Sequence, residues 1–379
     1  MKKRVYIILR FFYRLIKYKA ERNKRVREIG IIIRQLLGLR KIKRDTPHLI
    51  IFFIPGLDYF TGRESISGGL ISIISMVEES KKIFDKMNNI EVICCTYPNS
   101  HLLYKLKTFK NNTQIFSYSL VERYFNKVQS VMLHLPEIFT EDFNNRAGIL
   151  RFKGDIIHLN ILNQNINLMP DETIIHQLKN YFQLTTMTTA HKKYSTHFFS
   201  EKYKVPVHQI SVWISSEDYK KSNYLEKEQL ILFSPDNPEL TSKMMSIINN
   251  SLPHFKTEVI SGLSYEDYKN RIRDAKFIIT TGEGLDAYFI ESYFSGSVGL
   301  AIKNKDFFDE KYLGLEELLE EDELASIKLV ALLKKLDDQN IYRETNNSNS
   351  LLLKADYSKT NYENNLLEFY KRYRYTLII

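Results

Sequence analysis

From residue 48 onward, short apolar runs alternate with amphipathic stretches of helical spacing. The first run, His48–Pro55, is rich in branched and aromatic residues and predicts a buried strand, and the pattern at 69–80 predicts the helix after it. The runs that predict further strands are 91–97, 130–135, 155–162 and 184–189. Strands that alternate with helices need crossover connections, so this half of the chain is expected to form a parallel sheet covered on both faces.

The same alternation starts again after a polar stretch at 215–223. The expected elements are strands at 229–234, 257–260, 276–281 and 299–302, and helices at 241–250, 265–274 and 288–295. A second polar stretch, at 346–350, is typical of a break in structure and precedes a closing helix expected at 362–373.

We therefore predict an α/β protein with two doubly wound, Rossmann-like domains and a cleft between them. The chain of 379 residues is long enough for two domains, and its 44% hydrophobic content excludes a disordered protein. The expected division is a basic N-terminal helical segment at 1–45, a first domain at 46–215, a second domain at 216–350 and a closing helix at 351–379.

The two cysteines, Cys94 and Cys95, are adjacent within the expected strand. Neighbouring residues of a strand point to opposite faces, so this pair predicts neither a disulfide framework nor a metal site. A reducing, cytoplasmic compartment fits this cysteine usage best.

The positive charge of the chain is concentrated at its N-terminus. Residues 1–44 hold 16 of the 54 Lys and Arg residues but two of the 45 acidic residues, a net charge of +14, and the remainder carries −5. An acidic body argues against a nucleic-acid-binding core, and we expect no nucleic-acid partner.

Apolar positions in this segment recur at helical spacing, with cations on the other face. The apolar positions are Ile8, Phe11, Phe12, Leu15 and Ile16. Arg10 and Arg14 interrupt the run, so we expect no membrane span, and no cleavage site suggests a signal peptide. Such a helix suits an anionic membrane surface, and the alternatives are packing on the protein's own core and nucleic-acid binding. We expect a protein peripheral to the inner face of the cell membrane.

The loop after the strand at 276–281 carries the strongest candidate chemistry. Gly282 and Gly284 allow backbone N–H groups to approach a ligand, and the next helix begins with N–H groups that favour anionic or hydroxyl-rich ligands. Glu283 lies in the loop and Glu291 lies eight residues later, inside the helix. Two carboxylates so placed can accept hydrogen bonds from sugar hydroxyls.

The stretch from Glu283 to Ala301 resembles the donor-binding signature of retaining glycosyltransferases of family 4, which have the GT-B architecture of two Rossmann-like domains. Glu283, Gly284 and Glu291 match the signature, Gly296 matches its helix-ending glycine, and 299–302 matches its last strand. The second glycine and the prolines of the family motif are missing here.

This resemblance implies a role for each residue of the motif. Glu283 would lie beside the transferred sugar, and Glu291 would bind the nucleotide ribose. The N–H groups from Gly284 through Leu285 and Asp286 to Ala287 would meet the sugar hydroxyls, and the Asp286 side chain is a candidate to select the sugar.

The resemblance extends to other loops of the chain. Gly262 and Leu263 would hold the nucleotide base through their backbone. The family's diphosphate-binding Arg is absent from the loop at 233–243, where Lys243 and Ser234 are the candidate donors. The double glycine Gly68-Gly69 looks like the family's loop that approaches phosphate or acceptor.

Two further positions follow expected strands. His191, after 184–189, is named with Glu283 as a candidate catalytic residue because it can reach a donor phosphate or an acceptor hydroxyl. Asn163 stands where many family members have a histidine, and its amide can bind sugar hydroxyls but cannot act as a base. The resemblance implies no metal and no cofactor, with the nucleotide-sugar as substrate, because the leaving diphosphate can take the acceptor's proton.

The sequence thus indicates a metal-independent glycosyltransferase of hexosyltransferase type that uses a nucleotide-sugar donor. Its acceptor would be lipid-linked or a growing polysaccharide, as in the synthesis of lipopolysaccharide or capsule. Two alternatives stay open: a sugar-nucleotide epimerase of the same architecture, and an inactive, membrane-docked binding protein.

Overall fold

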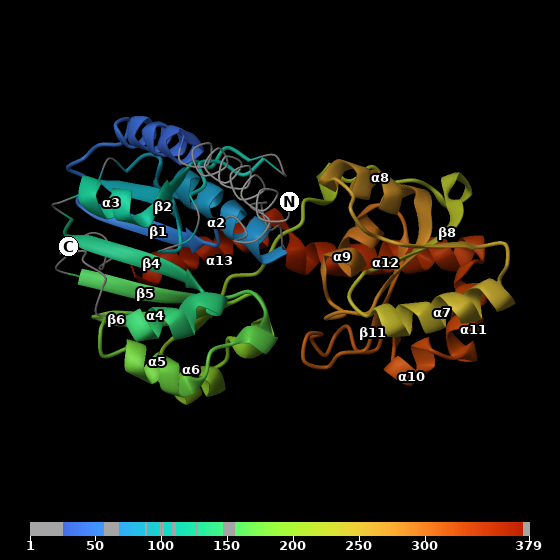
Figure 1. Ribbon diagram of the computed structural model, residues 1–379. Coiled ribbons are helices and arrows are strands. Elements are labelled where there is room, and N and C mark those ends of the chain that lie inside the picture. Colours follow the sequence, from blue (N-terminus) through green and yellow to red (C-terminus); the bar gives the residue numbers. More distant parts are fainter. Residues whose placement is uncertain are drawn as a thin grey trace, which may run out of the picture. The chain divides into compact units, whose positions relative to one another are not determined.

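The chain folds into two compact units, each built on parallel strands (Figure 1). The computed structural model describes residues 26–56, 68–87, 89–98, 100, 102–107, 111–125, 128–146 and 156–373. The first unit takes the chain up to Leu162, together with Pro170–Thr186 and the C-terminal residues from Tyr373. The second unit consists of Asn163–Met169 and Met187–Arg372.

The first sheet has seven strands in the order β3-β2-β1-β4-β5-β6-β7, the doubly wound pattern. Its strands are β1 (His48–Ile54), β2 (Ile90–Thr96), β3 (Ile115–Ser117), β4 (Ser130–Pro136), β5 (Ile156–Asn163), β6 (Leu184–Thr189) and β7 (Val207–Gln209). Every residue of β1 is buried, as its apolar run predicts. Cys94 and Cys95 are free, buried neighbours in β2, as expected.

Helices connect the strands of this sheet. They are α2 (Gly68–Phe84), α3 (Tyr118–Tyr124), α4 (Thr140–Arg146), α5 (Glu172–Leu178) and α6 (His197–Tyr203). Residues 26–39 are also helical, which confirms part of the expected N-terminal helix. The amphipathic positions between residues 8 and 16 lie outside the described residues. Within the part of the chain that the structure describes, no helix is both long and apolar enough to cross a membrane.

The second sheet has five parallel strands in the order β12-β11-β10-β8-β9. They are β8 (Glu228–Phe233), β9 (Lys256–Val259), β10 (Ala275–Thr280), β11 (Val298–Ile302) and β12 (Leu318–Leu319). The helices are α7 (Pro238–Ser251), α8 (Tyr265–Asp274), α9 (Ala287–Phe294), α10 (Glu321–Leu324), α11 (Ile327–Leu336), α12 (Gln339–Tyr357) and α13 (Lys359–Arg372). The predicted α/β class with two Rossmann-like sheets is confirmed.

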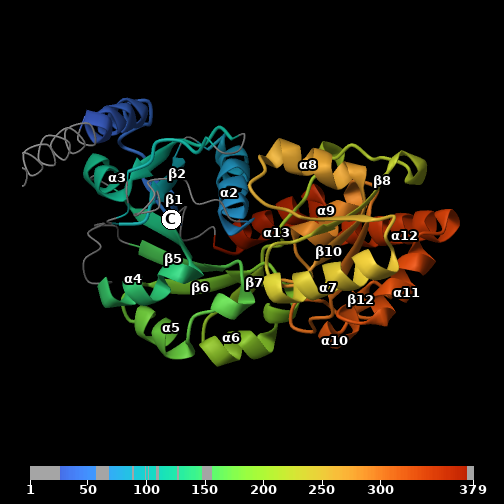
Figure 2. The ribbon, with the colours of Figure 1, turned by 45° about the vertical axis from the view of Figure 1, so that its right-hand side comes forward.

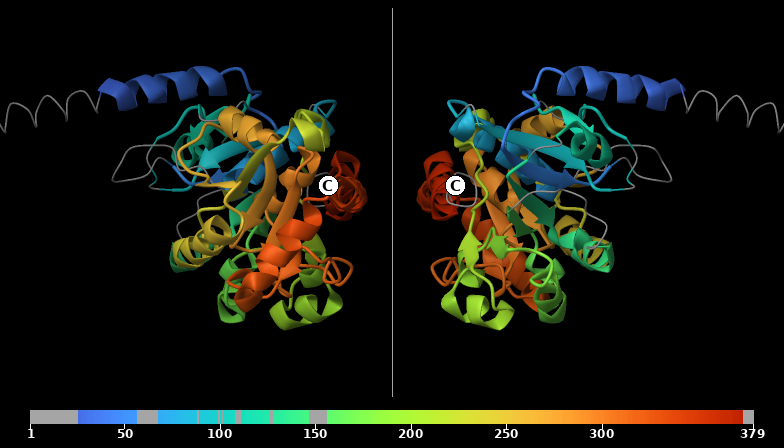
Figure 3. Two further views of the ribbon diagram at one scale, coloured as in Figure 1. Left: turned by 90° about the vertical axis from the view of Figure 1, so that its right-hand side faces the viewer. Right: turned by 90° about the vertical axis from the view of Figure 1, so that its left-hand side faces the viewer.

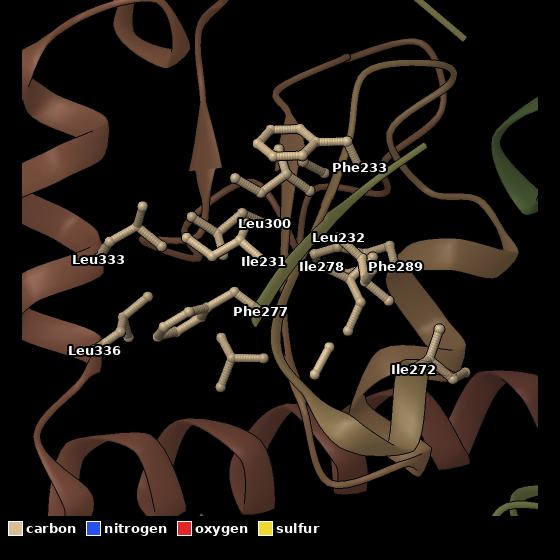
Figure 4. Close-up of a cluster of buried hydrophobic side chains, with 14 of the residues drawn as sticks. Ile231, Leu232, Phe233, Ile272, Phe277, Ile278, Phe289, Leu300, Leu333 and Leu336 are labelled. Atoms are coloured by element: carbon tan, nitrogen blue, oxygen red, sulfur yellow. The ribbon is translucent and has the colours of Figure 1, made fainter. Parts of the chain in front are cut away.

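Helices cover both faces of the second sheet. Helix α7 contacts α11, and α9 contacts both α8 and α12 (Figure 2). Figure 4 shows the core on one side of the sheet, where Ile231 and Phe277 meet Leu333 and Leu336 of α11. These side chains are all buried, and burying an apolar side chain of this size stabilises the fold by about 1.5–3 kcal/mol.

The polar stretch at 346–350 is not a break but the middle of helix α12. The prediction was wrong because the amides of this stretch find partners inside the protein. Asn346 Nδ2 donates to the carbonyl oxygens of Tyr293 (3.1 Å) and Ser297 (2.6 Å), and Asn349 Nδ2 donates to Glu317 (3.2 Å). A buried amide with satisfied hydrogen bonds is compatible with a packed helix face.

Helix α9 ends at Phe294, and the glycine that the sequence predicts at its end, Gly296, follows the C-cap residue Ser295. Gly296 has φ +81°, and a Cβ atom there would lie 2.4 Å from the carbonyl oxygen of Ser222. Only glycine tolerates both the left-handed backbone and this close approach, so the helix stops here and β11 follows at once.

Lys227 ties together the C-terminal ends of two helices of the second unit. Its buried Nζ donates to the carbonyl oxygens of Arg273 (2.5 Å) and Ser295 (2.9 Å), at the ends of α8 and α9, and to Ser297 Oγ (2.8 Å). These carbonyl groups have no partner within their own helices, so Lys227 supplies hydrogen bonds that the helix ends require.

We expect Lys227→Met to lower the free energy of unfolding by about 3 kcal/mol, because buried acceptors lose their donor. Thermal unfolding followed through the single tryptophan, Trp213, reports on the same unit. Lys256→Met is the matched control, since the Lys256 side chain is 69% exposed. Equal melting temperatures for the two variants would contradict a stabilising role for Lys227.

Candidate functional site

The strand order of the second sheet reverses between β8 and β10, and the loops after these two strands therefore lie side by side. In open α/β sheets, ligands bind outside the carboxyl ends of the strands at such a switch point. The buried Ser234 joins the two loops: its N–H donates to the carbonyl of Ile279 (3.0 Å), and its Oγ accepts from the N–H of Thr281 (3.1 Å). Ser234, a predicted hydrogen-bond donor to the diphosphate, thus lies in the loop after β8 and holds that loop against the loop after β10.

The turn from β10 into α9 is compressed around its two glycines. Gly284 has φ +87°, and a Cβ atom there would lie 2.6 Å from the carbonyl oxygen of Ile302 and 2.7 Å from the ring of Phe308. A Cβ atom on Gly282 would lie 2.9 Å from the carboxyl group of Asp236. Asp236 therefore reaches across from the loop after β8 to the backbone of Gly282, and the expected approach of this backbone to a ligand stays a prediction.

Asp286 is the N-cap residue of α9. Its Oδ1 accepts from the N–H of Phe289 (3.0 Å), and its Oδ2 accepts from the hydroxyl of Thr280. Burial raises the pKa of Asp286 to about 7, although both of these hydrogen bonds favour the charged form. Each carboxylate oxygen has a partner within the turn, so Asp286 fixes the start of α9. Its predicted role in sugar selection stays a prediction.

Glu283 extends from the same turn and is held by a residue from a distant part of the sequence. Asn165, in the loop after β5, donates from Nδ2 to Glu283 Oε1. Both residues belong to the second unit. Burial and the negative charge of Asp236 raise the pKa of Glu283, and the Asn165 hydrogen bond lowers it. Glu283 is partly buried, and the hydrogen bond from Asn165 fixes the direction of its carboxylate.

Glu291 is buried in the second turn of α9 within a group of tyrosines. The hydroxyls of Tyr219, Tyr265 and Tyr268 lie close enough to act on its pKa as hydrogen-bond donors, but Oε2 and the Tyr268 hydroxyl form no hydrogen bond of ordinary length and angle. Burial raises the pKa of Glu291, and the nearby hydroxyls of Tyr219 and Tyr268 oppose that rise. The Tyr219 hydroxyl lies 2.8 Å from that of Tyr265, whose side chain is half exposed. Glu291 Oε2 is thus a buried acceptor near the partly exposed side chain of Tyr265. A ligand hydroxyl that reaches this position can donate a hydrogen bond to it.

The segment expected to hold a nucleotide base leads into α8. Gly262 has φ +65°, and it and Leu263 are exposed. Ser264 Oγ then caps α8 by accepting from the N–H of Asp267 (3.2 Å). The contact of residues 262–263 with a nucleotide base stays a prediction.

His191 packs against the loop after β11. Its ring centroid is 5.4 Å from that of Phe307, and the next residue, Phe308, borders Gly284. Burial lowers the pKa of His191 to about 4, so the imidazole is neutral at pH 7. It can donate or accept one hydrogen bond there, but it does not carry the positive charge that would neutralise a phosphate.

Lys243 lies away from this turn, on the exposed second turn of α7. Its Nζ is 2.8 Å from Glu239 Oε1, an ion pair in which both side chains are mostly exposed. It lines a hollow of about 600 Å³ together with the acidic residues Glu320, Glu321 and Asp322. This acidic surrounding does not favour a diphosphate, and the predicted role of Lys243 finds no support in its geometry.

The surroundings of the other predicted loop residues are described within their own units. Asn163 is buried, and its Nδ2 donates to the carbonyl oxygen of Thr188 (2.9 Å), which joins the ends of β5 and β6. Gly68 and its neighbour Gly69 begin α2 in the first unit. Among the described residues, no three His, Cys, Asp or Glu side chains converge to hold a metal ion.

Three groups of this site were missed by the sequence analysis: Asn165, Asp236 and the tyrosines around Glu291. Asn165 and Asp236 each stand after an expected strand, which was the available signal. Tyr265 and Tyr268 have the i, i+3 spacing of one helix face, but nothing in this spacing indicated that they surround a carboxylate.

Comparison with known proteins identifies the architecture. No protein-family model matches the sequence, and no curated protein matches it significantly. A solved alpha-glucosyltransferase in complex with UDP-glucose and DNA containing an abasic site is similar in structure, with a TM-score of 0.50 and 8% identity over 87% of this chain and 99% of that chain. The chain therefore has the GT-B fold with two Rossmann-like domains, and at this identity the likeness establishes the fold alone.

Two other solved structures are similar over most of their length. The MnaA–UDP complex of S. aureus has a TM-score of 0.49 and 14% identity, covering 88% of this chain and 98% of that chain. The UDP-GlcNAc 2-epimerase of Neisseria meningitidis, bound to UDP-GlcNAc, has a TM-score of 0.48 and 12% identity, covering 86% and 99%.

Asp286 makes the stability of the second unit depend on pH. Its folded-state pKa of about 7 lies above the unfolded value of about 3.9, so the folded state holds a proton that the unfolded state releases between these values. The wild type therefore loses stability as pH rises from 4 to 7. We expect Asp286→Asn to be up to about 3 kcal/mol more stable than the wild type at pH 8, and to gain nothing at pH 4.

Denaturant titrations of both proteins at several pH values measure this difference. Asparagine preserves the N-cap acceptor for Phe289, and its Nδ2 can donate to the Thr280 hydroxyl where Oδ2 accepts from it, so the substitution removes the charge and reverses one hydrogen bond. Asp322→Asn, at an exposed position of α10, is the control for an unspecific effect of charge. A difference between Asp286→Asn and the wild type that does not vary with pH would show that Asp286 is not protonated in the fold.

Proposed function

We propose that this protein is a glycosyltransferase that binds a nucleotide-sugar donor at the carboxyl ends of β8 and β10. The observation that carries the proposal is the contrast between two carboxylates, one in the loop before α9 and one in the second turn of that helix. Glu283 is partly exposed and oriented by Asn165, whereas Glu291 is buried with an oxygen that lacks a partner. One carboxylate is thus suited to a reacting sugar and the other to a bound hydroxyl pair.

The Glu291 carboxylate would accept hydrogen bonds from the ribose of the donor. The tyrosine hydroxyls lie where such a ligand hydroxyl would be, and Tyr265 is the exposed member of that group. Binding would then displace the Tyr265 hydroxyl and place the base against the exposed backbone at Gly262 and Leu263. The ligand hydroxyl would then supply the donor that Glu291 Oε2 lacks in the unliganded protein.

Glu283 would contact the hydroxyls of the transferred sugar. The N–H groups from Gly284 to Ala287 follow it directly in the chain and would be the donors to those hydroxyls. Positioning is the main contribution that we assign to this turn, because correct alignment of donor and acceptor accounts for a large part of the barrier that such enzymes lower.

The proposed reaction breaks the bond between the sugar C1 and the diphosphate oxygen and forms a bond between C1 and the acceptor oxygen. The acceptor oxygen would attack C1 on the face that the diphosphate leaves, which retains the configuration at C1. Its proton would pass to the leaving diphosphate, so the protein supplies no general base. The neutral His191 and the amide of Asn165 can orient a hydroxyl without taking its proton.

We propose a lipid-linked or polysaccharide acceptor, in the synthesis of a surface glycan such as lipopolysaccharide or capsule. The support is the basic N-terminal segment, whose cations suit an anionic membrane surface on the cytoplasmic side. A membrane-bound acceptor would then be presented to a protein that is peripheral to the same membrane.

A rival function is a protein that binds a nucleotide-sugar without transferring it. Two observations favour this rival. The negative charges of Asp236 and Glu283, in addition to burial, raise the pKa of Asp286, so the turn is acidic. The predicted cation Lys243 forms an ion pair with Glu239. An epimerase of the same architecture is distinguished by its products, because it would convert the nucleotide-sugar when no acceptor is present.

A panel of nucleotide-sugars tested by thermal shift separates these readings. We expect at least one to stabilise the protein, by about 2.7 kcal/mol at a concentration 100 times its Kd.

Glu291→Ala should weaken that binding at least tenfold. Glu283→Gln should preserve binding and lower transfer by about 100-fold, and the exposed Glu239→Gln is the control. If both site variants bind and turn over like the wild type, the site is misassigned.

Asn165 tests whether the direction of Glu283 matters. Asn165→Ala should lower kcat about tenfold with little change in KM, because the carboxylate loses its orientation but the donor keeps its contacts. Since the Asn165 hydrogen bond lowers the pKa of Glu283, its loss should move the acid limb of the kcat profile to higher pH. Asn167→Ala, in the same turn and exposed, should change neither quantity. An unmoved acid limb would rule out this role for Asn165.

A further inference from the structure

The helix formed by residues 26–39 is fixed to the first unit along one face. Gln35 is fully buried on that face: its Nε2 donates to the carbonyl oxygen of Leu103 (2.8 Å), and its Oε1 accepts from the N–H of Ser117 (3.0 Å). Leu39, one turn later, is also buried, and Gly38 lies against Phe116. These contacts set the rotation of the helix about its own axis.

The opposite face carries apolar side chains that are exposed to solvent. They are Val26 (64% exposed), Ile29 (55%), Ile33 (51%), Leu36 (41%) and Leu37 (53%), and we call them the outer stripe. Their spacing places them within about one third of the helix circumference, roughly opposite Gln35. Figure 3 shows this helix at the periphery of the first unit, in dark blue.

Cations border the outer stripe. Arg27 and Arg34 are exposed, and their positions on the helix lie beside the stripe rather than behind it. Between residues 26 and 44 the sequence contains one acidic residue, Glu28, and cations continue past the end of the helix at Arg40 and Lys41. An apolar stripe with a cationic border matches the boundary between the headgroups and acyl chains of an anionic bilayer.

We infer that the outer stripe docks the protein on anionic lipid, with the helix lying parallel to the membrane surface. Its apolar side chains would enter the acyl boundary, and Arg27 and Arg34 would remain among the headgroups. This inference deepens the proposed membrane association and does not depend on the nucleotide-sugar site. A second copy of the chain is a poorer occupant, because pairing two such stripes brings cations of the same sign together.

Vesicle binding by the full chain tests the inference. Ile29→Ser, Ile33→Ser and Leu37→Ser are combined in one variant, and because the three side chains are exposed the fold should be preserved. The matched control combines Leu225→Ser, Ile327→Ser and Leu351→Ser, which are 78%, 70% and 71% exposed elsewhere on the protein. With vesicles that contain 30% phosphatidylglycerol, the stripe variant should bind at least tenfold more weakly than the control.

A fluorescent label placed on the stripe gives a direct reading. The native cysteines Cys94 and Cys95 are buried, so Ile33→Cys provides an accessible thiol for an environment-sensitive dye. Its emission should shift to the blue with phosphatidylglycerol vesicles and remain unchanged with phosphatidylcholine vesicles. The same dye on Leu351→Cys should remain in water with both.

Two outcomes would overturn the inference. If the stripe variant binds anionic vesicles as the control does and the Ile33 dye stays in water, another part of the chain makes the contact. If sedimentation shows a dimer that the stripe variant alone dissociates, a second copy covers the stripe. Thermal shift with nucleotide-sugars on the same variants separates either result from a failure of the proposed enzymatic function, since stripe substitutions should leave that shift unchanged.

Discussion

The reversal of strand order between β8 and β10 is the constraint on which the candidate site depends. Because each strand runs parallel to its neighbours and the helices after β8 and β10 cover opposite faces, the two loops separate above the sheet edge. In our proposal, backbone groups of both loops meet the ligand at this edge. Ser234 joins the loops at their base and keeps this opening in a fixed place.

The turn from β10 to α9 uses this opening through conformations that few sequences permit. Gly284 accepts a left-handed backbone against Ile302 and Phe308, and Asp286 then caps the helix, which places Glu291 one turn inside the core and Glu283 at its edge. Burial disfavours the charged form of the Asp286 carboxyl, so this group makes the folded protein less stable at neutral pH than at pH 4. Such costs are typical of sites where function fixes the residues.

Much of this arrangement could be predicted from the sequence, for physical reasons that also explain the failures. Long apolar runs such as 48–54 and 276–280 predict buried strands, and Gly296 predicts a helix end. These signals depend only on residues that are neighbours in the sequence. Three-residue strands such as Ile115–Ser117 carry too little pattern, and the polar face of α12 looked like a loop because its hydrogen-bond acceptors are distant in sequence. The contact between Asn165 and Glu283 joins residues 118 positions apart, which no local pattern encodes.

The central claim is that a nucleotide binds across the carboxyl ends of β8 and β10, and hydrogen exchange measured with and without a nucleoside diphosphate tests it most directly. We expect slower exchange of the backbone amides at 261–264 and 282–288 when the nucleotide is present, because these N–H groups would be covered or hydrogen-bonded by it. Slower exchange confined to other segments, with these two ranges unchanged, would contradict the account.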